Sequence, residues 1–277
     1  MISARRSACL YPQGGAIYES AKAANTFDTY VSNYDSDNPM IFLKAAHSYR
    51  VAEIAERIAR SLGQEELVDF AWLLGLLHDI GRFEQAKRYN TFADSQSVDH
   101  AELGTDILFK EGLIDCFPTE TLPEGWQNIA ETAIRLHNKL ALPDGLDKDT
   151  ETLSNILRDA DKVDIFRVLN EISYADRNGG RQPVRPDNDE LSPEVMACVR
   201  EHRCVPSGVR KTFFDRRVSH CCLAFELIYE ESRKIATEQG YLLKLLTMQD
   251  RDGLSAGNDR QLASLALVAE EIEKAWA

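Results

Sequence analysis

Histidine and aspartate side chains recur where predicted helices face the protein core. The pair His78-Asp79 directly follows the apolar stretch FAWLLGLL, residues 70–77, and burying two such polar groups is costly unless a partner compensates them. A cation is the simplest partner, because the pair supplies an imidazole nitrogen and up to two carboxylate oxygens. That mixture suits Fe, Mn, Co or Zn.

Four more residues of these two types fall on apolar helix faces elsewhere in the chain. They are His47, His100, His137 and Asp161. Each histidine taken singly is more typical of a core imidazole bonded to a backbone carbonyl, whereas the six residues together favour a metal site. Six ligands exceed what one tetrahedral ion needs, and a carboxylate can bridge, so we expect two ions that share Asp79.

The apolar pattern around these residues predicts helices and scarcely any strands, which indicates an all-α fold. The first helix is expected between the capping pair Asn38-Pro39 and Gly63. The next helices are expected from about Gln64, from Ser97 or Asp99, from Trp126 and from Thr150. Further helices are expected after Ser192-Pro193, along a stripe from Val218 to Tyr229 that Gly240 can cap, and over 261–276.

The segments between the predicted helices suggest how the chain is divided. Residues 1–38 form an N-terminal arm, 39–178 a metal-binding helical domain, and 179–277 a C-terminal helical extension packed on that domain. The Gly-, Pro- and charge-rich segment 179–189 is the expected linker. Residues 81–98 are polar, aromatic and basic, and we expect a loop that lines the substrate site.

The composition narrows the class of protein and its partners. The 277 residues include 32 basic and 45 acidic ones, and the net charge of −13 argues against long nucleic acid or an anionic membrane as a partner. The six cysteines form no CxxC pair and predict reduced thiols in a cytoplasmic protein without a signal peptide. Acidic helical domains of this size are commonly monomers or homodimers.

The ordered pattern H…HD…H…H…D, with HDIG at 78–81 and RDADKVD at 158–164, resembles the HD-domain superfamily of metal-dependent phosphohydrolases. The resemblance covers about 40–178 and implies an HD-domain helical bundle with additional C-terminal helices. It implies that one ion is held by His47, His78, Asp79 and Asp161. By the same resemblance, His100 and His137 complete a second site that Asp79 bridges. The GYP tripeptide of cyclic-di-GMP phosphodiesterases is replaced by HNKLALPDG, so that narrower assignment is not made.

The expected reaction is hydrolysis of a phosphoester in a small phosphorylated molecule, such as a nucleotide or related metabolite, by a metal-activated hydroxide. His-rich sites with two aspartates favour Fe or Mn, with Mg, Co, Ni or Zn as alternatives. Asp79, Arg82 and Lys162 are the candidate catalytic residues. Arg82, Lys87 and Arg88 are the candidate phosphate-binding residues, and each cation could instead be an ordinary solvated or structural side chain.

Other interpretations remain open at this point. The same six ligands are similar to those of the di-iron oxygenases in this superfamily, and a non-catalytic metal-bearing sensor that binds a partner is a third class. The basic patch within 200–217 could recognise phosphate, although a solvated or packing face is more typical. A zinc site among the cysteines and histidines of 198–222 is disfavoured, because no ligand pair has zinc-knuckle spacing.

Overall fold

In the computed structural model, residues 16–177, 180, 190–249 and 258–277 can be described, with side chains from residue 20 onward. Every regular element within these residues is helical, which confirms the predicted all-α fold. The α-helices are α1 (Ala16–Val31), α2 (Pro39–Ser61), α3 (Glu65–Leu77), α4 (Ile80–Tyr89), α5 (His100–Thr105), α6 (Trp126–Leu136), α7 (Lys148–Glu171), α8 (Tyr174–Arg177), α9 (Pro193–Arg200), α10 (Phe213–Cys221), α11 (Glu230–Gln239), α12 (Tyr241–Leu246) and α13 (Asp259–Trp276). No helix among the described residues is long and apolar enough to cross a membrane.

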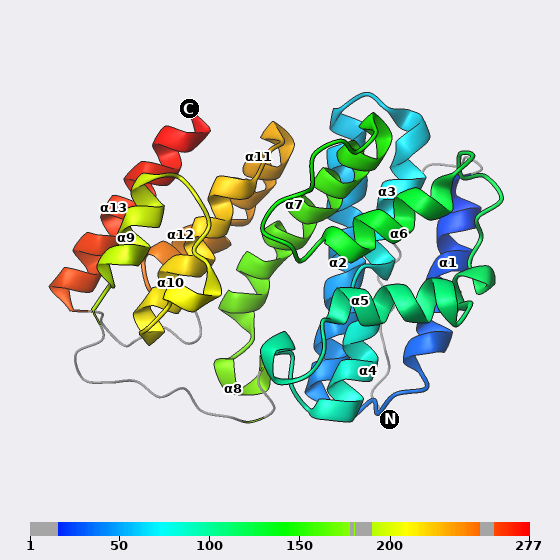
Figure 1. The fold of residues 1–277 in the computed structure, drawn as a ribbon, viewed down its shortest axis with the longest axis horizontal. Helices are drawn as coiled ribbons and strands as arrows, with labels where there is room; N and C mark the ends of the chain where they lie inside the picture. Colours follow the sequence, from blue (N-terminus) through cyan, green and yellow to red (C-terminus); the bar gives the residue numbers. More distant parts are fainter. Residues whose placement is uncertain (1–15, 178–179, 181–189, 250–257) are drawn as a thin grey trace.

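Helix α7 lies at the centre of the molecule. It contacts α2, α3 and α6 on one side and α11 and α12 on the other. The N-terminal helices α1 to α6 therefore form one half of the structure and α9 to α13 the other half (Figure 1). The division into three segments at residues 38 and 178 stays a prediction.

The helix starts near the candidate site follow the capping signals of the sequence. The Asn38 side chain accepts the backbone N–H of Met40 at 2.9 Å, and Pro39 occupies the first turn of α2. Asp99 caps α5 in the same way, accepting the N–H of Ala101 at 3.0 Å. These caps determine where His47 and His100 lie along their helices.

Helices α2 and α3 approach each other closely at Gly75. A Cβ atom there would lie 2.6 Å from the Cα of Ala52, so only glycine permits this contact. The end of α3, where His78 and Asp79 follow, is thereby held against the middle of α2.

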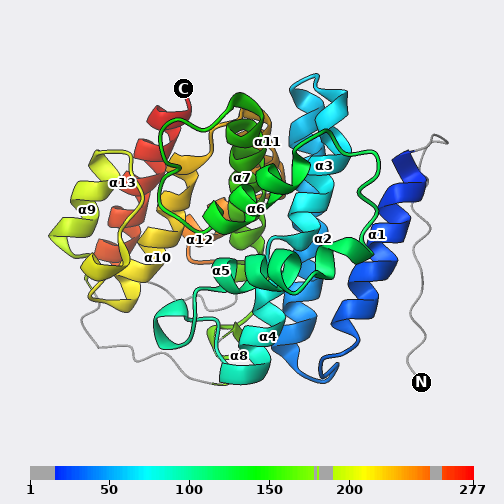
Figure 2. The same cartoon turned by 45° about the vertical axis from the view of Figure 1, so that its right-hand side comes forward.

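Helix α1 is more regular than the arm expected from its polar composition. Ala23 and Phe27 are buried, and the Phe27 ring packs on Tyr49 and Phe83 with centroid distances of 5.4 and 5.8 Å. Figure 2 shows α1 at the outer edge of the N-terminal half. One buried residue per turn is enough to attach this helix.

Two expectations about local structure were wrong. Residues 80–89 form helix α4 rather than a loop, and only 90–99 are irregular, with a short 3-10 helix at Asp94–Gln96. The stripe from Val218 to Tyr229 does not form one helix, because α10 ends at Cys221, a 3-10 helix follows, and α11 begins at Glu230. The predicted linker 179–189 lies, apart from Gly180, outside the described residues.

Candidate metal centre

The six candidate ligands come together from five separate helices or helix ends. His47 lies within α2, His78 and Asp79 follow the end of α3, and Asp161 lies within α7. His100 is the first residue of α5, and His137 follows the last residue of α6. His47, His78, Asp79, His100 and His137 are all at most 4% exposed.

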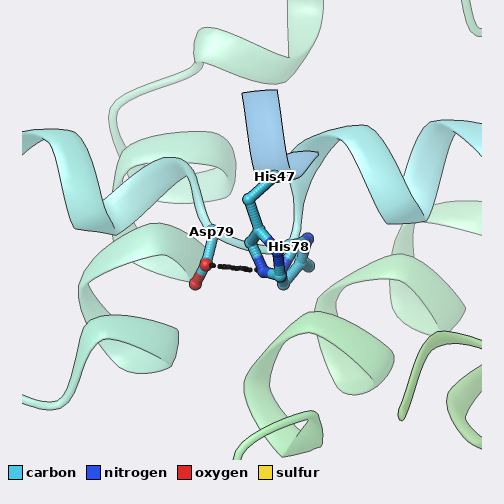
Figure 3. A group of neighbouring side chains, drawn as sticks. All are labelled: His47, His78 and Asp79. Atoms are coloured by element: carbon cyan, nitrogen blue, oxygen red, sulfur yellow. Dashed lines mark ion pairs between the residues drawn. The ribbon is translucent and has the colours of Figure 1, made fainter. Parts of the chain in front are cut away.

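Asp79 lies between two pairs of imidazoles. Its Oδ2 atom is 3.5 Å from Nε2 of His47 and 3.3 Å from Nε2 of His78. Its Oδ1 atom is 3.5 Å from Nε2 of His100 and 3.8 Å from Nε2 of His137. Figure 3 shows the first of these pairs beside the Asp79 carboxylate. Each oxygen of one carboxylate thus faces its own pair of nitrogens.

Asp161 joins the first pair. Its Oδ1 atom lies 3.0 Å from Nε2 of His47 and 3.6 Å from Nε2 of His78. The atoms therefore fall into two overlapping groups. One group contains His47, His78, Asp79 and Asp161, and the other contains Asp79, His100 and His137. The groups adjoin, since ligand atoms of His137 also lie within 4.8 Å of those of His78 and Asp161.

The Nδ1 atoms of the four imidazoles all face acceptors outside the cluster. Nδ1 of His78 donates to the carbonyl of Gly75 and Nδ1 of His137 to the carbonyl of Ile134, both at 2.7 Å. Carbonyls only accept, so Nδ1 carries a proton in both rings, and in the neutral form of each ring the Nε2 lone pair is directed inward.

Carboxylates hold the other two rings. Nδ1 of His47 lies 2.6 Å from Oδ2 of Asp164, and Nδ1 of His100 lies 2.7 Å from Oδ2 of Asp94. Burial opposes ionisation of both acids, but the imidazole contacts hold the pKa of Asp164 and of Asp94 below the usual range. Such outer partners orient metal-ligating histidines and raise their basicity.

The residues present fit a bound cation. Nε2 of His100 and Nε2 of His137 are 3.0 Å apart, and in the neutral rings both are lone-pair acceptors, so their approach is repulsive without a cation between them. Nε2 of His78 and Oδ1 of Asp79 are buried without a hydrogen-bond partner among the described residues. Two imidazole pairs and two carboxylates form a donor set suited to divalent transition metals.

The electrostatics of the cluster favour acids in their charged form. Burial opposes this, but Lys44 and His78 hold the pKa of Asp79 well below its usual range, and His47 and His78 do the same for Asp161. Burial likewise opposes charge on His78, yet Asp79 and Asp161 raise its pKa to about 10. Burial and the neighbouring His100 lower the pKa of His137 to about 3, so that ring is neutral.

The sequence reasoning did not single out Lys44. Its Nζ atom lies 2.5 Å from Oδ2 of Asp79, and the side chain is largely buried. Lys44 precedes His47 by three residues on α2, so the two side chains share one helix face. That spacing was the available signal, but it does not distinguish a site lysine from a solvated one.

Arg82 lies at the site and organises the segment after α4. Its Nη1 atom donates to the Phe92 carbonyl at 2.7 Å, to Gln85 at 2.6 Å and to Asp94 at 3.0 Å. Nε lies 3.5 Å from Oδ1 of Asp79. Arg82 therefore links the cluster to the segment that carries Asp94, the partner of His100.

The remaining candidate cations divide into one near the cluster and two away from it. Lys162 is 8% exposed, pairs with Glu226 at 3.1 Å, and lines the same cavity as Asp161. Lys87 and Arg88 are more than half exposed and lie beside Glu84 on α4, outside the cavities that adjoin the cluster. The structure does not bring these two to the site, because they lie on another face of a helix that the sequence reasoning treated as a loop.

The cluster opens into a cavity of about 870 Å³. Its wall includes Asp79, Asp161, His100 and His137. The cationic side chains in the wall are Lys44, Arg82, Lys139, Lys162, Arg210 and Arg216. The volume is ample for a small organic phosphate. Among the described residues, no potential metal-binding group includes a cysteine, so the disfavoured zinc site gains no support.

Comparison with known protein families identifies the segment that contains the six candidate ligands. Residues 45–165 match the model of the HD domain, and this range begins just before His47 and ends just after Asp161. No curated protein and no solved structure shows significant similarity to the chain. Residues 45–165 of this chain are therefore an HD domain.

Proposed function

We propose that this protein is a metal-dependent phosphohydrolase that cleaves a phosphoester of a small molecule, such as a nucleotide or related metabolite. One observation carries the proposal: each oxygen of Asp79 faces a separate pair of Nε2 atoms within 3.8 Å. A bridging carboxylate between two donor groups is the arrangement that two-metal hydrolases use.

The proposed ligands follow the two groups. His47, His78, Asp79 and Asp161 would hold the first ion, and Asp79, His100 and His137 the second. Imidazole and carboxylate donors favour Fe or Mn over Mg. When bound, such ions lower the pKa of water so that hydroxide is available near neutral pH, and they neutralise phosphoryl charge.

The chain's own cations would bind and orient the substrate. Lys44, Arg82 and Lys162 lie in the cavity wall beside the candidate ligands, where their positive charges can attract phosphate oxygens. Arg82 also holds Asp94 against His100, so it would act on the second ion's site as well as on the substrate.

The first test combines elemental analysis with a phosphoester panel. We expect about two metal ions per chain after reconstitution with Mn²⁺ or Fe²⁺, and turnover of at least one substrate among p-nitrophenyl esters, nucleotides and dinucleotides. Asp79→Asn should lose both the metal and the turnover. Asp106→Asn is the matched control, because Asp106 pairs with Lys110 on the surface and should behave as wild type.

A second pair of variants tests the number of ions. Asp164→Asn removes the charged acceptor of His47, and Asp94→Asn removes that of His100. Each variant should therefore lower the affinity for a different one of the two ions by about 10- to 100-fold. Titration of metal-free protein should show one weakened and one unchanged site in each variant. Loss of the same single site in both variants would contradict the two-ion proposal.

Two results would favour the alternative functions. Two irons per chain with no phosphoester cleaved would favour a di-iron oxygenase. Metal binding without any turnover, together with a partner interaction that survives Asp79→Asn, would favour a sensor module.

A further inference from the structure

A second cavity, of about 430 Å³, adjoins the cavity of the candidate metal centre. The two cavities share part of their walls. The shared residues include Lys44, Arg82, Phe92, Arg210, Arg216 and His220. A molecule with its phosphate at the metal centre can therefore extend into the second cavity without leaving the protein.

The second cavity is strongly basic in a chain whose net charge is −13. Arg177, Arg210, Arg216 and Arg217 line it together with His220. Within the described parts of the chain, no carboxylate forms an ion pair with Arg210 or Arg216. Arg216 instead donates to the hydroxyl of Tyr174 at 3.5 Å. Two neighbouring guanidiniums without acidic partners are unfavourable unless an anion binds there.

The surrounding groups agree with this excess of positive charge. Burial and the neighbouring Arg216 both lower the pKa of Arg210. Burial, followed by the charges of Arg177 and Arg210, lowers the pKa of His220 to about 3, so His220 adds no charge of its own. The positive potential of the cavity therefore comes from the arginines and Lys44.

Apart from the arginines, His220 and Lys44, the wall of the second cavity is apolar or aromatic. Phe92 lies between the two cavities, with Nζ of Lys44 at 5.3 Å and Cζ of Arg82 at 5.5 Å from its ring centroid. Tyr174 and Phe213 form an edge-to-face pair with centroids 5.8 Å apart. A ring or short carbon skeleton can pack against such a surface between two charged ends.

We propose that the substrate carries two phosphate groups separated by a ring or carbon skeleton, and that Arg210 and Arg216 bind the phosphate that is not cleaved. This inference rests on the proposed phosphohydrolase function. Guanidinium groups suit this task because their planar N–H donors match phosphate oxygens in a bidentate manner. The site is built across the two halves of the structure, since Arg210 and Arg216 come from the C-terminal half and Lys44 and Arg82 from the N-terminal half.

The test compares the kcat/KM of two probes. Adenosine 3′,5′-bisphosphate has two separated phosphates, and p-nitrophenyl phosphate has one. We expect the ratio of kcat/KM, bisphosphate over p-nitrophenyl phosphate, to fall at least about tenfold in the double variant Arg210→Gln/Arg216→Gln, as the loss of charged hydrogen bonds implies.

The matched control removes two positive charges from the same basic patch but away from the cavity. Lys211 pairs with Glu194 at 2.5 Å, and Arg203 pairs with Glu201. Neither Lys211 nor Arg203 lines the cavity. The double variant Arg203→Gln/Lys211→Gln should keep the wild-type ratio. An equal fall in both double variants, or no fall in either, would overturn the proposal.

Failure of this proposal can be distinguished from failure of the proposed function. If no phosphoester is cleaved, the proposed function fails. Calorimetry of nucleotide binding then tests separately whether the second phosphate site exists. Binding of adenosine 3′,5′-bisphosphate that is at least about tenfold tighter than that of adenosine 5′-monophosphate, and that only Arg210→Gln/Arg216→Gln abolishes, would support the second phosphate site. Equal binding of the two nucleotides would overturn it.

Discussion

At the scale of single residues, the candidate centre depends on which nitrogen of each imidazole carries the proton. The carbonyls of Gly75 and Ile134 hold two rings, and the carboxylates of Asp164 and Asp94 hold the other two. All four Nε2 atoms are thereby directed at Asp79 or Asp161. Such fixed orientation lowers the entropy lost when a ligand atom engages an ion.

The pKa of His78 predicts how metal binding depends on pH. Because this pKa is raised to about 10, the ring is protonated at pH 8 in the metal-free protein, and ligation must displace that proton. Apparent affinity for Mn²⁺ should therefore rise with pH, by up to about tenfold per unit below pH 10. Calorimetry in two buffers with different ionisation enthalpies should show release of at least about one proton per chain.

The exposed His202 provides the control for this measurement. It pairs with Glu271 and takes no part in the cluster, so His202→Gln should leave the proton release unchanged. Affinity for Mn²⁺ that does not change between pH 6 and 9 would contradict the prediction.

At the scale of elements, the contact between α4 and α5 decides whether His100 reaches the cluster. A Cβ atom on Gly81 would lie 2.3 Å from the carbonyl oxygen of His100 and 2.6 Å from the backbone nitrogen of Gly104. Backbone atoms cannot move aside as a flexible side chain can. Glycine in the HDIG sequence therefore permits the approach of the helix that brings the second histidine pair.

Gly81→Ala should destabilise the protein and lower its affinity for the second ion. Forcing α5 away from α4 is an overpacking change, for which we expect a loss of about 3 kcal/mol in the free energy of unfolding. Denaturant unfolding and metal titration measure the two effects. Gly208→Ala, where nothing lies within 4 Å of the added Cβ, should change stability by less than about 0.5 kcal/mol. Wild-type stability and metal content in Gly81→Ala would refute this account of α5.

At the scale of the whole molecule, hydrogen bonds to Asp159 connect the C-terminal half to the HD domain. This buried carboxylate of α7 accepts the backbone N–H groups of Ile228 and Tyr229 at 2.9 and 3.0 Å. The contact lies two residues before the candidate ligand Asp161 in α7 and directly before the start of α11. The two halves are thus joined by a buried polar contact.

Asp159→Ala should lower the free energy of unfolding by about 2–4 kcal/mol, because it leaves two buried donors without an acceptor. Asp159→Asn is the control, since its side-chain oxygen can still accept, and it should lose clearly less. Equilibrium unfolding in denaturant compares the two variants. Equal losses would show that the negative charge, rather than the presence of an acceptor, is what matters.

The sequence alone was sufficient for the helical class, for most helix starts near the site and for the identity of the residues that meet there. Local signals explain this success. The caps at Asn38 and Asp99 and the apolar stripes act within a few residues, and histidines on those stripes must face the core. The residues' roles as metal ligands stay a prediction.

Other features depended on contacts between residues far apart in the chain. Helix α4 was missed because its buried face is short. The break before α11 was missed because Asp159, which accepts the backbone N–H of Ile228 there, lies about 70 residues earlier. Tertiary structure also separated the basic patch into Arg210 and Arg216, which line the cavity, and Lys211, which does not. The packing of the helices also brings Lys44 and Arg82 to the site, whereas Lys87 and Arg88 lie away from it. Periodicity indicates which residues face inward, but only the packing of the helices decides which of them meet.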